Sequence, residues 1–450
     1  MFSLSEKKKK ELISESDKLL SELFPLCRSL TGEGLRTTLK KLNEITSFRI
    51  KEFKSGKEYY DWKIPDEWII REAFIRDSKG NKIIDFKDNN LHVVNYSNPI
   101  KANLNYYELK QKIHILADLK DAIPYRTAYY SEDWGFCMSS EDFKKLDKND
   151  TYEVLIDSEF KKGVLNYGEH TIRGRNPKRT YIFTSYPCHP SLANDNLSGI
   201  ILWIFLLREL KKLDLENNYI FAIHPETIGA IAYLKTNEKK MKKVEAGSVL
   251  TTVAGPGKYS IKKSFLQNSI MDRVNLKTFK DFGVDYIEYD FDPDAGSDER
   301  QYSSQYFGIP MTSICKDKYF EYDFYHTSKD NLDFISSIDL IETLNLYLSS
   351  ISKLERNFIY KSLNPKCEPM LGKRGLYPSI GGQLKQNSHK DNNDDDNSER
   401  TLSAINWLMY LCDGKNDILD IAERTDLNFD LVSDVAQLLE KNKLLKRLNK

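Results

Sequence analysis

The sequence has no run of about 18 consecutive apolar residues, so no segment is expected to cross a membrane. Residues 1–20 are rich in lysine and lack the apolar core of a secretory signal. There is no Cys-x-x-Cys pair, and the cysteines are scattered along the chain, at Cys27, Cys137, Cys188, Cys315, Cys367 and Cys412. Scattered thiols without a pairing framework favour a reducing compartment, and we therefore expect a cytoplasmic protein.

An excess of charge of one sign is also missing. The 67 lysine and arginine residues balance 67 aspartate and glutamate residues, which gives a formal net charge of zero at pH 7. Proteins that bind nucleic acids or anionic membranes usually carry a basic excess, so we expect neither partner. The balance is compatible with an enzyme that acts on small or neutral substrates.

The chain is too long for one compact core, and we expect two or three domains. Residues 4–46 have the apolar spacing of helices. Residues 53–167 hold short β-branched and aromatic runs separated by turn residues, which predicts a β-rich domain. From residue 180 strands alternate with helices, which predicts an α/β fold with a mixed, mostly parallel sheet flanked by helices.

The C-terminal part begins after a polar, acidic tract. Residues 386–400 contain no apolar side chain and are expected to form a flexible linker. Residues 401–450 have the pattern of a small helix-turn-helix domain. Its candidate recognition stretch contains Asp430 and Asp434, which would repel phosphates, so a protein-contact module is favoured over DNA binding. Either this domain or the insertion could form a homo-oligomer interface.

The densest group of chemically reactive residues spans 186–199, between a buried strand and an apolar helix. His189 and Asp195 lie on this one loop, and a neutral imidazole and a carboxylate placed so can turn towards a single cation. Alternatively, Asp195 only caps the helix and His189 is a polar loop residue. The local sequence leaves both interpretations open.

Two further elements also join a strand to a helix. Glu226 directly follows a buried strand, where it can act as general base or as metal ligand, or simply favour the first turn of a helix. His326 opens the last helical stretch of the α/β part and would supply a third zinc ligand, unless it is incidental to a helix N-terminal box. Ligand sites in such sheets gather at the carboxyl ends of the strands, where all three elements are expected to lie.

A fourth element combines charge with glycine. Asp298, Glu299 and Arg300 follow a turn ahead of a predicted strand at 311–314. Acidic groups beside an arginine suit recognition of the amino or carboxylate end of a substrate. The same residues can equally form a salt-bridged loop.

These elements, in this order, resemble the zinc aminopeptidase superfamily that includes bacterial leucyl aminopeptidases and glutaminyl cyclases. Residues 195–199 are similar to its Asp-Asn-Ala-Ser-Gly motif, whose aspartate binds metal. Still closer is the resemblance to a bacterial family of aminopeptidase-like proteins associated with polysaccharide biosynthesis, carried by residues 188–195, 296–302 and 325–328. This resemblance implies an aminopeptidase-like domain at 1–52 and 168–365, an insertion at 53–167, a linker at 366–400 and a winged helix at 401–450.

The sequence departs from the superfamily pattern at metal positions. Ser191 replaces the aspartate of a His-x-Asp pair, and Gly255 stands where a strand should end in a metal aspartate. When the superfamily's Glu-Glu-x-Gly motif is aligned on Gly229, Glu226 takes the place of the base and Thr227 that of a metal ligand. When the motif is aligned on Pro225 and Glu226, Glu226 takes the ligand's place and no base remains. We prefer the first alignment and expect one zinc ion.

The resemblance and the residues together predict a zinc-dependent hydrolase that cleaves a peptide or amide bond. The predicted roles are zinc ligation by His189, Asp195 and His326, base catalysis by Glu226, and substrate binding by Asp298, Glu299 and Arg300. We expect the insertion to cover the cleft, with Tyr125, Tyr129, Tyr130 and Trp134 either lining it or forming the insertion's own core. The alternative function is a catalytically inactive metal-binding or regulatory protein with a winged-helix interaction module.

Overall fold

The computed structural model describes residues 2–176, 178–376 and 393–448, without the side chains of 393–398. The chain divides into two compact units. The larger unit comprises residues 4–272 and 285–347, and the smaller one residues 1–3, 273–284 and 348–450. Within the described residues, no helix is both long and apolar enough to span a bilayer.

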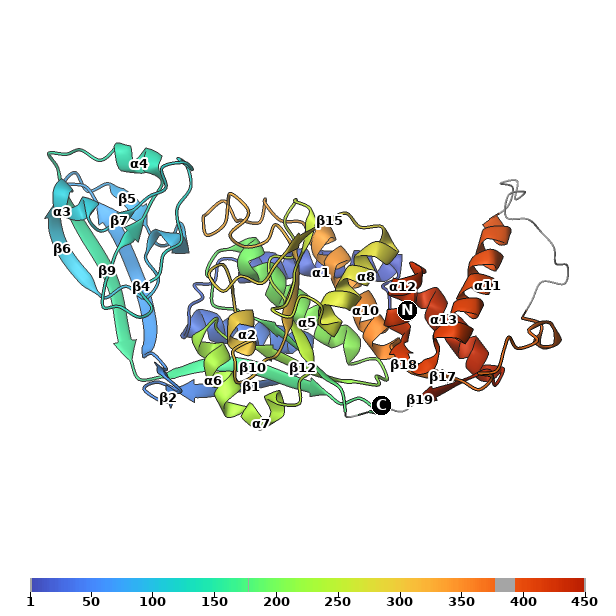
Figure 1. Cartoon of the computed structure of the whole chain (residues 1–450). Coiled ribbons are helices and arrows are strands. Elements are labelled where there is room, and N and C mark those ends of the chain that lie inside the picture. The colour runs from blue at the N-terminus through green and yellow to red at the C-terminus, as the bar shows by residue number, and fades with distance from the viewer. Residues whose placement is uncertain (1, 177, 377–392, 449–450) are drawn as a thin grey trace. The chain divides into compact units, whose positions relative to one another are not determined.

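An eight-stranded sheet forms the centre of the larger unit, in the order β1-β10-β12-β11-β13-β16-β14-β15 (Figure 1). The central strands β12, β11, β13 and β16 run parallel, and antiparallel pairs join β1, β10 and β14 to the sheet. This mixed sheet confirms the predicted fold class. Its strands are β1 (Arg49–Lys54), β10 (Val164–Ile172), β11 (Thr180–Ser185), β12 (Asn218–Ile223), β13 (Ala246–Val249), β14 (Tyr259–Lys262), β15 (Tyr286–Tyr289) and β16 (Met311–Lys316).

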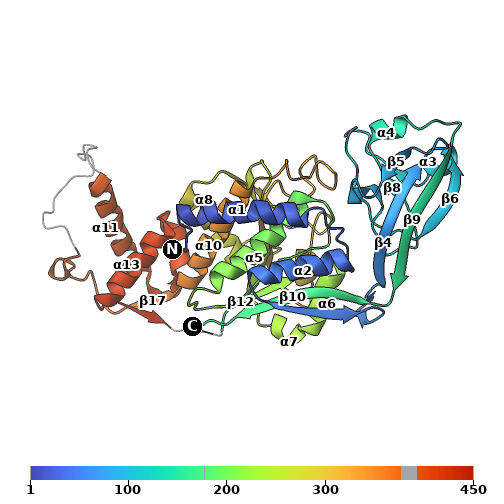
Figure 2. The same ribbon diagram turned by 180° about the vertical axis from the view of Figure 1, so that it is seen from behind.

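Helices cover this sheet because their apolar faces need a buried partner. In α5 (Gly199–Leu210) ten residues are buried, and Figure 2 shows α1 (Glu6–Leu23) and α2 (Glu33–Ile45) across the same face. The Ser5 hydroxyl starts α1 by accepting from the amide of Lys8. Outside the insertion, the other helical elements that lie wholly or partly in this unit are η2 (Ala193–Ser198), α6 (Ile228–Thr236), α7 (Glu238–Met241), α8 (Ile270–Phe282), α9 (Glu299–Tyr302) and α10 (Ser337–Arg356).

The insertion is built on an antiparallel sheet in the order β5-β4-β9-β6, which confirms a β-rich texture. The sheet strands are β4 (Glu67–Arg76), β5 (Lys82–Asp85), β6 (Ile100–Asn105) and β9 (Thr151–Lys161). The smaller elements are β2 (Glu58–Tyr59), β3 (Trp62–Lys63), η1 (Asn90–His92), α3 (Tyr106–Lys110), β7 (Ile113–His114), β8 (Phe136–Cys137) and α4 (Ser140–Lys144). The run Leu-His-Val-Val at 91–94 has the composition of a strand. The structure instead has a short 3-10 turn there, because the Asn89 side chain accepts from the amide of Leu91 and caps the turn.

The smaller unit contains the C-terminal domain. A three-stranded sheet in the order β18-β17-β19 joins β17 (Ile359–Ser362), β18 (Asp413–Asp417) and β19 (Leu445–Leu448). Its helical elements are η3 (Gly372–Arg374), α11 (Asn393–Leu411), α12 (Ile418–Thr425) and α13 (Phe429–Lys441). Because β17 is the central strand, this domain starts before the predicted residue 401. Residues 393–400 of the predicted linker belong to α11, and 377–392 lie outside the described residues.

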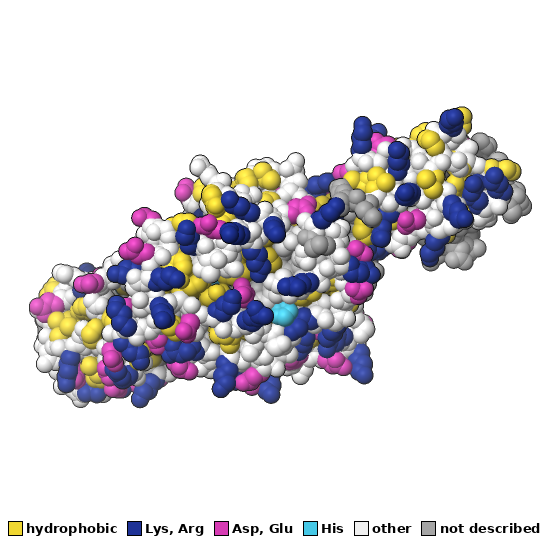
Figure 3. Space-filling view, turned by 90° about the horizontal axis from the view of Figure 1, so that it is seen from below, with side chains coloured by type: hydrophobic (Ala, Val, Ile, Leu, Met, Phe, Trp, Pro, Cys, Tyr) yellow, Lys and Arg dark blue, Asp and Glu magenta, His cyan; other side chains and the backbone are white. Residues whose placement is uncertain are grey.

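Charged side chains of both signs cover the surface. Figure 3 shows lysine and arginine side chains scattered over the face presented, with aspartate and glutamate between them.

Candidate metal centre and active site

The loop after β11 carries the first two candidate ligands. All six residues of β11 are buried, so the strand fixes the start of this loop inside the protein. His189 and Asp195 are 6% and 1% exposed, respectively. Nε2 of His189 lies 3.9 Å from Oδ2 of Asp195. The two side chains therefore face each other across the loop that leads into α5.

His326 reaches the same point from the segment that precedes α10. Its Nε2 lies 3.1 Å from Oδ2 of Asp195. The backbone of this segment pairs with the insertion, because the amide of Tyr125 donates to the carbonyl of His326 at 2.8 Å. The ring of Tyr125 consequently packs against both histidines, with centroid distances of 5.3 Å to His189 and 5.1 Å to His326. The insertion thus supplies one wall of the site.

Other aromatic residues of the insertion divide between this wall and the insertion's own core. The hydroxyls of Tyr125 and Tyr129 are 2.7 Å apart, and Tyr130 is 58% exposed beside them. Trp134 instead packs against Phe136 in the core of the insertion. Both of the expected placements therefore occur, each for different residues.

The three candidate ligands form one group. One ligand atom from each of His189, Asp195 and His326 lies within 4.8 Å of the others. Burial lowers the pKa of His189 to about 4, so its imidazole is neutral at neutral pH, which is the form that binds metals. Burial opposes ionisation of Asp195, but the two histidines and the Tyr186 hydroxyl outweigh it and hold the pKa of that carboxyl below its usual value. The donor set and its protonation suit zinc.

A buried carboxylate, Asp330, holds the backbone of the first loop. It accepts from the amides of Asn194 and Asp195 at 2.6 and 2.9 Å, and from the hydroxyl of Tyr322 at 2.9 Å. Burial raises the pKa of Asp330 to about 7. Asp330 was not among the predicted site residues, although it lies within the same element as His326.

Glu226 follows β12 and enters the site from the neighbouring strand. Its Oε2 lies 3.9 Å from Nε2 of His189, and its Oε1 accepts from the hydroxyl of Ser297 at 2.6 Å. The side chain is 27% exposed. Burial raises the pKa of Glu226 to about 7, while the hydrogen bond from Ser297 acts in the opposite direction. A carboxylate with such a pKa can take up and release a proton near neutral pH.

The predicted substrate-binding acids are turned into the protein. Asp298 is fully buried and accepts from the amide of Thr227 at 2.8 Å. Glu299 is 1% exposed and accepts from the ammonium of Lys262 at 2.5 Å and from the hydroxyl of Tyr319 at 3.2 Å. Sequence patterns gave no signal for the partner Lys262, which lies on β14.

Arg300 has a different environment from the two acids. It is half-buried, and its Nε and Nη1 donate to the carbonyls of Ser297 and Pro293, both at 3.2 Å. Ser297 in turn donates its hydroxyl to Glu226 at 2.6 Å. The ring of Tyr325, near the same centre, stacks on His326 with centroids 3.9 Å apart. Arg300 is therefore placed at the edge of the candidate site.

The loops of the site contain strained backbone. Ser191, Thr227 and His326 have φ values of 43°, 62° and 55°, in the left-handed region that side chains other than glycine rarely adopt. For a β-branched residue such as Thr227 this conformation is especially costly. Strain of this kind concentrates at functional sites, where the surrounding structure enforces it.

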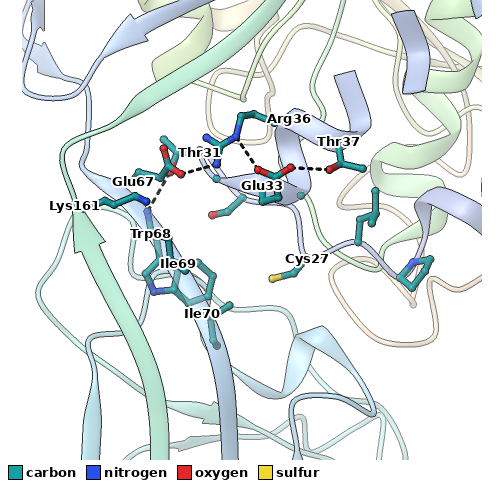
Figure 4. Close-up of a pocket in the computed structure, with 15 residues that line it drawn as sticks. Cys27, Thr31, Glu33, Arg36, Thr37, Glu67, Trp68, Ile69, Ile70 and Lys161 are labelled. Carbon is teal, nitrogen blue, oxygen red and sulfur yellow. Dashed lines mark hydrogen bonds and ion pairs between the residues drawn. The ribbon is translucent and has the colours of Figure 1, made fainter. Parts of the chain in front are cut away.

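A cavity of about 470 Å³ lies between the α1–α2 loop and the start of β4. Figure 4 shows Arg36 between Glu33 and Glu67, at 3.0 and 2.7 Å, with Cys27 on the opposite wall. These three charges pair with one another instead of facing a ligand. None of the predicted site residues lines this cavity.

The sequence matches two known families. Residues 17–357 match a family described as a domain of unknown function, DUF4910, and residues 358–447 match a winged helix-turn-helix family. The chain belongs to the DUF4910 family. A relative from Clostridium acetobutylicum, named "Putative polysaccharide biosynthesis protein with aminopeptidase-like domain", is 41% identical over 430 residues and matches over 95% of each chain. The family predicted from the motifs is thereby confirmed.

Two solved structures are similar to this DUF4910 chain. The crystal structure of a "putative peptidase" from Clostridium acetobutylicum shares 39% identity and a TM-score of 0.89, over 98% of each chain. The zinc aminopeptidase BSAP from Bacillus subtilis has a TM-score of 0.57 at 15% identity, over 77% of this chain and 95% of that one. At such low identity the second likeness shows the fold alone, which is aminopeptidase-like.

Proposed function

We propose that this DUF4910 protein is a zinc-dependent hydrolase that cleaves a peptide or amide bond. The observation that carries the proposal is the convergence of His189, Asp195 and His326, with ligand atoms within 4.8 Å of one another. Two imidazoles and a carboxylate, with a fourth position left for water, are the ligand pattern of catalytic zinc. The names of two similar structures, a "putative peptidase" and a zinc aminopeptidase of similar fold, agree with this chemistry.

Zinc held by these residues would activate a water molecule and polarise the substrate carbonyl. Glu226 is the group that takes the proton of the attacking water, and it then delivers that proton to the leaving nitrogen. Its pKa of about 7, set mainly by burial, suits both transfers. Ser297 holds the carboxylate in place through its hydroxyl.

A single zinc ion is the proposed stoichiometry. Thr227 and Gly255 occupy the positions at which the aminopeptidases that this sequence resembles carry further metal carboxylates. The carboxylate of Asp298 does not replace them, because it is fully buried and accepts from the amide of Thr227. These residues supply no second set of oxygen ligands beside Asp195.

The substrate is proposed to be a small peptide or an amide-bearing compound. The name of the Clostridium acetobutylicum relative connects it with polysaccharide biosynthesis, which extends the candidates to amide-bearing sugar intermediates. The aromatic wall formed by Tyr125 and Tyr325 suits either kind of molecule.

Zinc content and turnover of matched variants test the proposal. We expect wild type to bind one zinc ion and Glu226→Gln to keep it while losing turnover on an amide library. His189→Ala should lose the zinc, whereas His170→Ala, a half-buried histidine on β10, should keep both zinc and turnover. Loss of zinc from Glu226→Gln would instead make Glu226 a ligand.

The missing carboxylates at Thr227 and Gly255 also favour a second candidate, a metal-binding protein without catalytic activity. The same experiment separates the two. Stoichiometric zinc in the wild type, with no turnover of any aminoacyl, peptide or amide substrate, would support the second candidate and contradict the hydrolase.

A further inference from the structure

We infer that this site accepts an acyl group that carries no ammonium charge, so that its substrates are N-acyl amides instead of peptides with a free N-terminus. The inference rests on the proposed function and specifies its substrate class. An aminopeptidase substrate places an α-ammonium one carbon from the scissile carbonyl. Such a cation is costly to desolvate unless a carboxylate receives it.

The two carboxylates that reach the centre already have partners. Asp195 accepts from the Tyr186 hydroxyl at 2.7 Å through one oxygen and faces His326 at 3.1 Å through the other. Glu226 accepts from Ser297 through one oxygen, and the other faces His189. Binding an ammonium through either residue would remove a metal ligand or the base.

The next two carboxylates cannot reach a substrate. Asp298 is fully buried, with one oxygen on the amide of Thr227 and the other 3.5 Å from Nδ1 of His224. Glu299 is paired with Lys262, and both side chains are 2% exposed. The acids at 298 and 299 therefore stabilise the loop, and neither presents its charge to the cleft.

Two arginines beside the ligand loops form no ion pair within the described residues. Arg300 donates only to backbone carbonyls, and within the described residues it forms no ion pair. Arg28 is 1% exposed behind the first ligand loop and donates to the carbonyl of His189 at 2.8 Å, while its Nη2 has no partner. Because neither guanidinium is held in an ion pair with a carboxylate, each adds a repulsive contribution for a cation brought to the metal centre.

Aromatic rings beside the candidate ligands suit an uncharged acyl chain. Tyr325 stacks on His326, and the ring of Phe320 lies 4.8 Å from Tyr325 and is 52% exposed. The ring of Tyr125 packs against both histidines. Aromatic walls with few polar groups favour apolar ligand parts.

A matched pair of zinc-binding inhibitors tests the inference without requiring turnover. Leucine hydroxamic acid and 4-methylpentanehydroxamic acid differ only in the α-amino group. Their affinities for the zinc-loaded full chain would be measured by calorimetry at about pH 6.5, where most of the amine is protonated. We expect the compound without the amine to bind at least roughly tenfold more tightly.

Each outcome has a distinct meaning. Equal or tighter binding of leucine hydroxamic acid overturns the inference and leaves the proposed hydrolase standing. Failure of both compounds to bind the zinc-loaded chain overturns the proposed function together with the inference.

Variants of Arg300 identify the source of the preference. Arg300→Gln should tighten leucine hydroxamic acid binding by roughly threefold or more and leave the amine-free compound nearly unchanged, because only the amine is repelled. Arg300→Lys should restore the difference, and Arg175→Gln, an exposed arginine paired with Glu216, should not alter it. Equal weakening of both compounds by Arg300→Gln would mean a purely structural role.

Discussion

Ser297 donates a hydrogen bond from its hydroxyl to Oε1 of Glu226 over 2.6 Å. The amide of the same residue donates to both carboxylate oxygens of Glu299, at 2.9 and 3.0 Å, and Glu299 is paired with the buried Lys262. A buried ion pair thus fixes the residue that holds the candidate base. Hydrogen bonds to the charged form of a carboxyl lower its pKa, so Ser297 opposes the effect of burial on Glu226.

Replacing Ser297 by alanine should move the pH dependence of catalysis. Without the donor, the pKa of Glu226 should rise above its value of about 7, by on the order of one unit. Because the base acts when deprotonated, the acid limb of the kcat/KM profile should shift to higher pH. Ser297→Thr retains a hydroxyl and should restore the profile, and the exposed Ser304→Ala should not change it. An unshifted acid limb in Ser297→Ala would exclude Glu226 as the titrating base.

The stability of the zinc-free chain should depend on the protonation of Glu226. Its folded pKa of about 7 lies above the ordinary 4.5, so the folded state binds this proton more tightly than the unfolded state. Ionisation therefore destabilises the fold increasingly as the pH rises from about 4.5 to about 7. Glu226→Gln should be more stable than wild type at pH 8 by on the order of 2 kcal/mol, allowing for partial exposure, and should lose this advantage at about pH 4.5.

Urea unfolding of both zinc-free proteins at the two pH values measures this difference. Glu238→Gln provides a control of the opposite sign, because Tyr60 and Lys235 hold the pKa of that half-buried carboxyl below its usual value. A stability difference between wild type and Glu226→Gln that is the same at both pH values would contradict the raised pKa.

Parts of this site could be predicted because their determinants are local. His189 and Asp195 lie on one loop between a buried strand and an apolar helix, so their proximity follows from a short stretch of sequence. His326 joins them from a segment far along the chain, where the start of a helical stretch and the family motif at 325–328 indicated its role. Its position is fixed by pairing with Tyr125 of the insertion, which no local pattern encodes.

The environments of Asp298 and Glu299 could not be predicted in the same way. A turn rich in charged residues is typical of the protein surface. Here both acids are buried, and each has a partner inside the protein: Glu299 pairs with Lys262 on β14, and Asp298 accepts from the amide of Thr227. These partners are brought together by the order of strands in the sheet, a long-range property. For the same reason the role of Asp330 in fixing the amides of Asn194 and Asp195 was visible only in the structure.

Replacing Asp330 by asparagine should weaken zinc binding without removing a ligand. The carboxylate accepts from two backbone amides beside the ligand Asp195, and an asparagine would leave at least one of them poorly paired. Loss of such an outer contact typically costs roughly 10- to 100-fold in metal affinity. Competition with a chromophoric chelator measures this change, with the exposed Asp333→Asn as control. Unchanged zinc affinity in Asp330→Asn would show that Asp195 needs no such support.

The C-terminal helix α13 gives the last prediction. A recognition helix reads DNA bases through its N-terminal residues. Here that end is engaged within its own unit: Asp430 pairs with Arg356 at 2.6 Å, and the amide of Phe429 donates to Asp281 at 3.3 Å. Arg356→Ala would leave the half-buried Asp430 without its cation, a loss of about 1–3 kcal/mol.

Hydrogen exchange of the α13 amides should therefore become roughly 10- to 100-fold faster in Arg356→Ala, since exchange follows the free energy of local opening. The exposed Arg424→Ala should leave exchange unchanged. Because the acidic residues of α13 repel phosphates, the wild-type chain should also give no salt-sensitive mobility shift on random duplex DNA. If exchange were unaltered in Arg356→Ala and the wild type gave such a shift, α13 would instead be assigned as a DNA-binding helix.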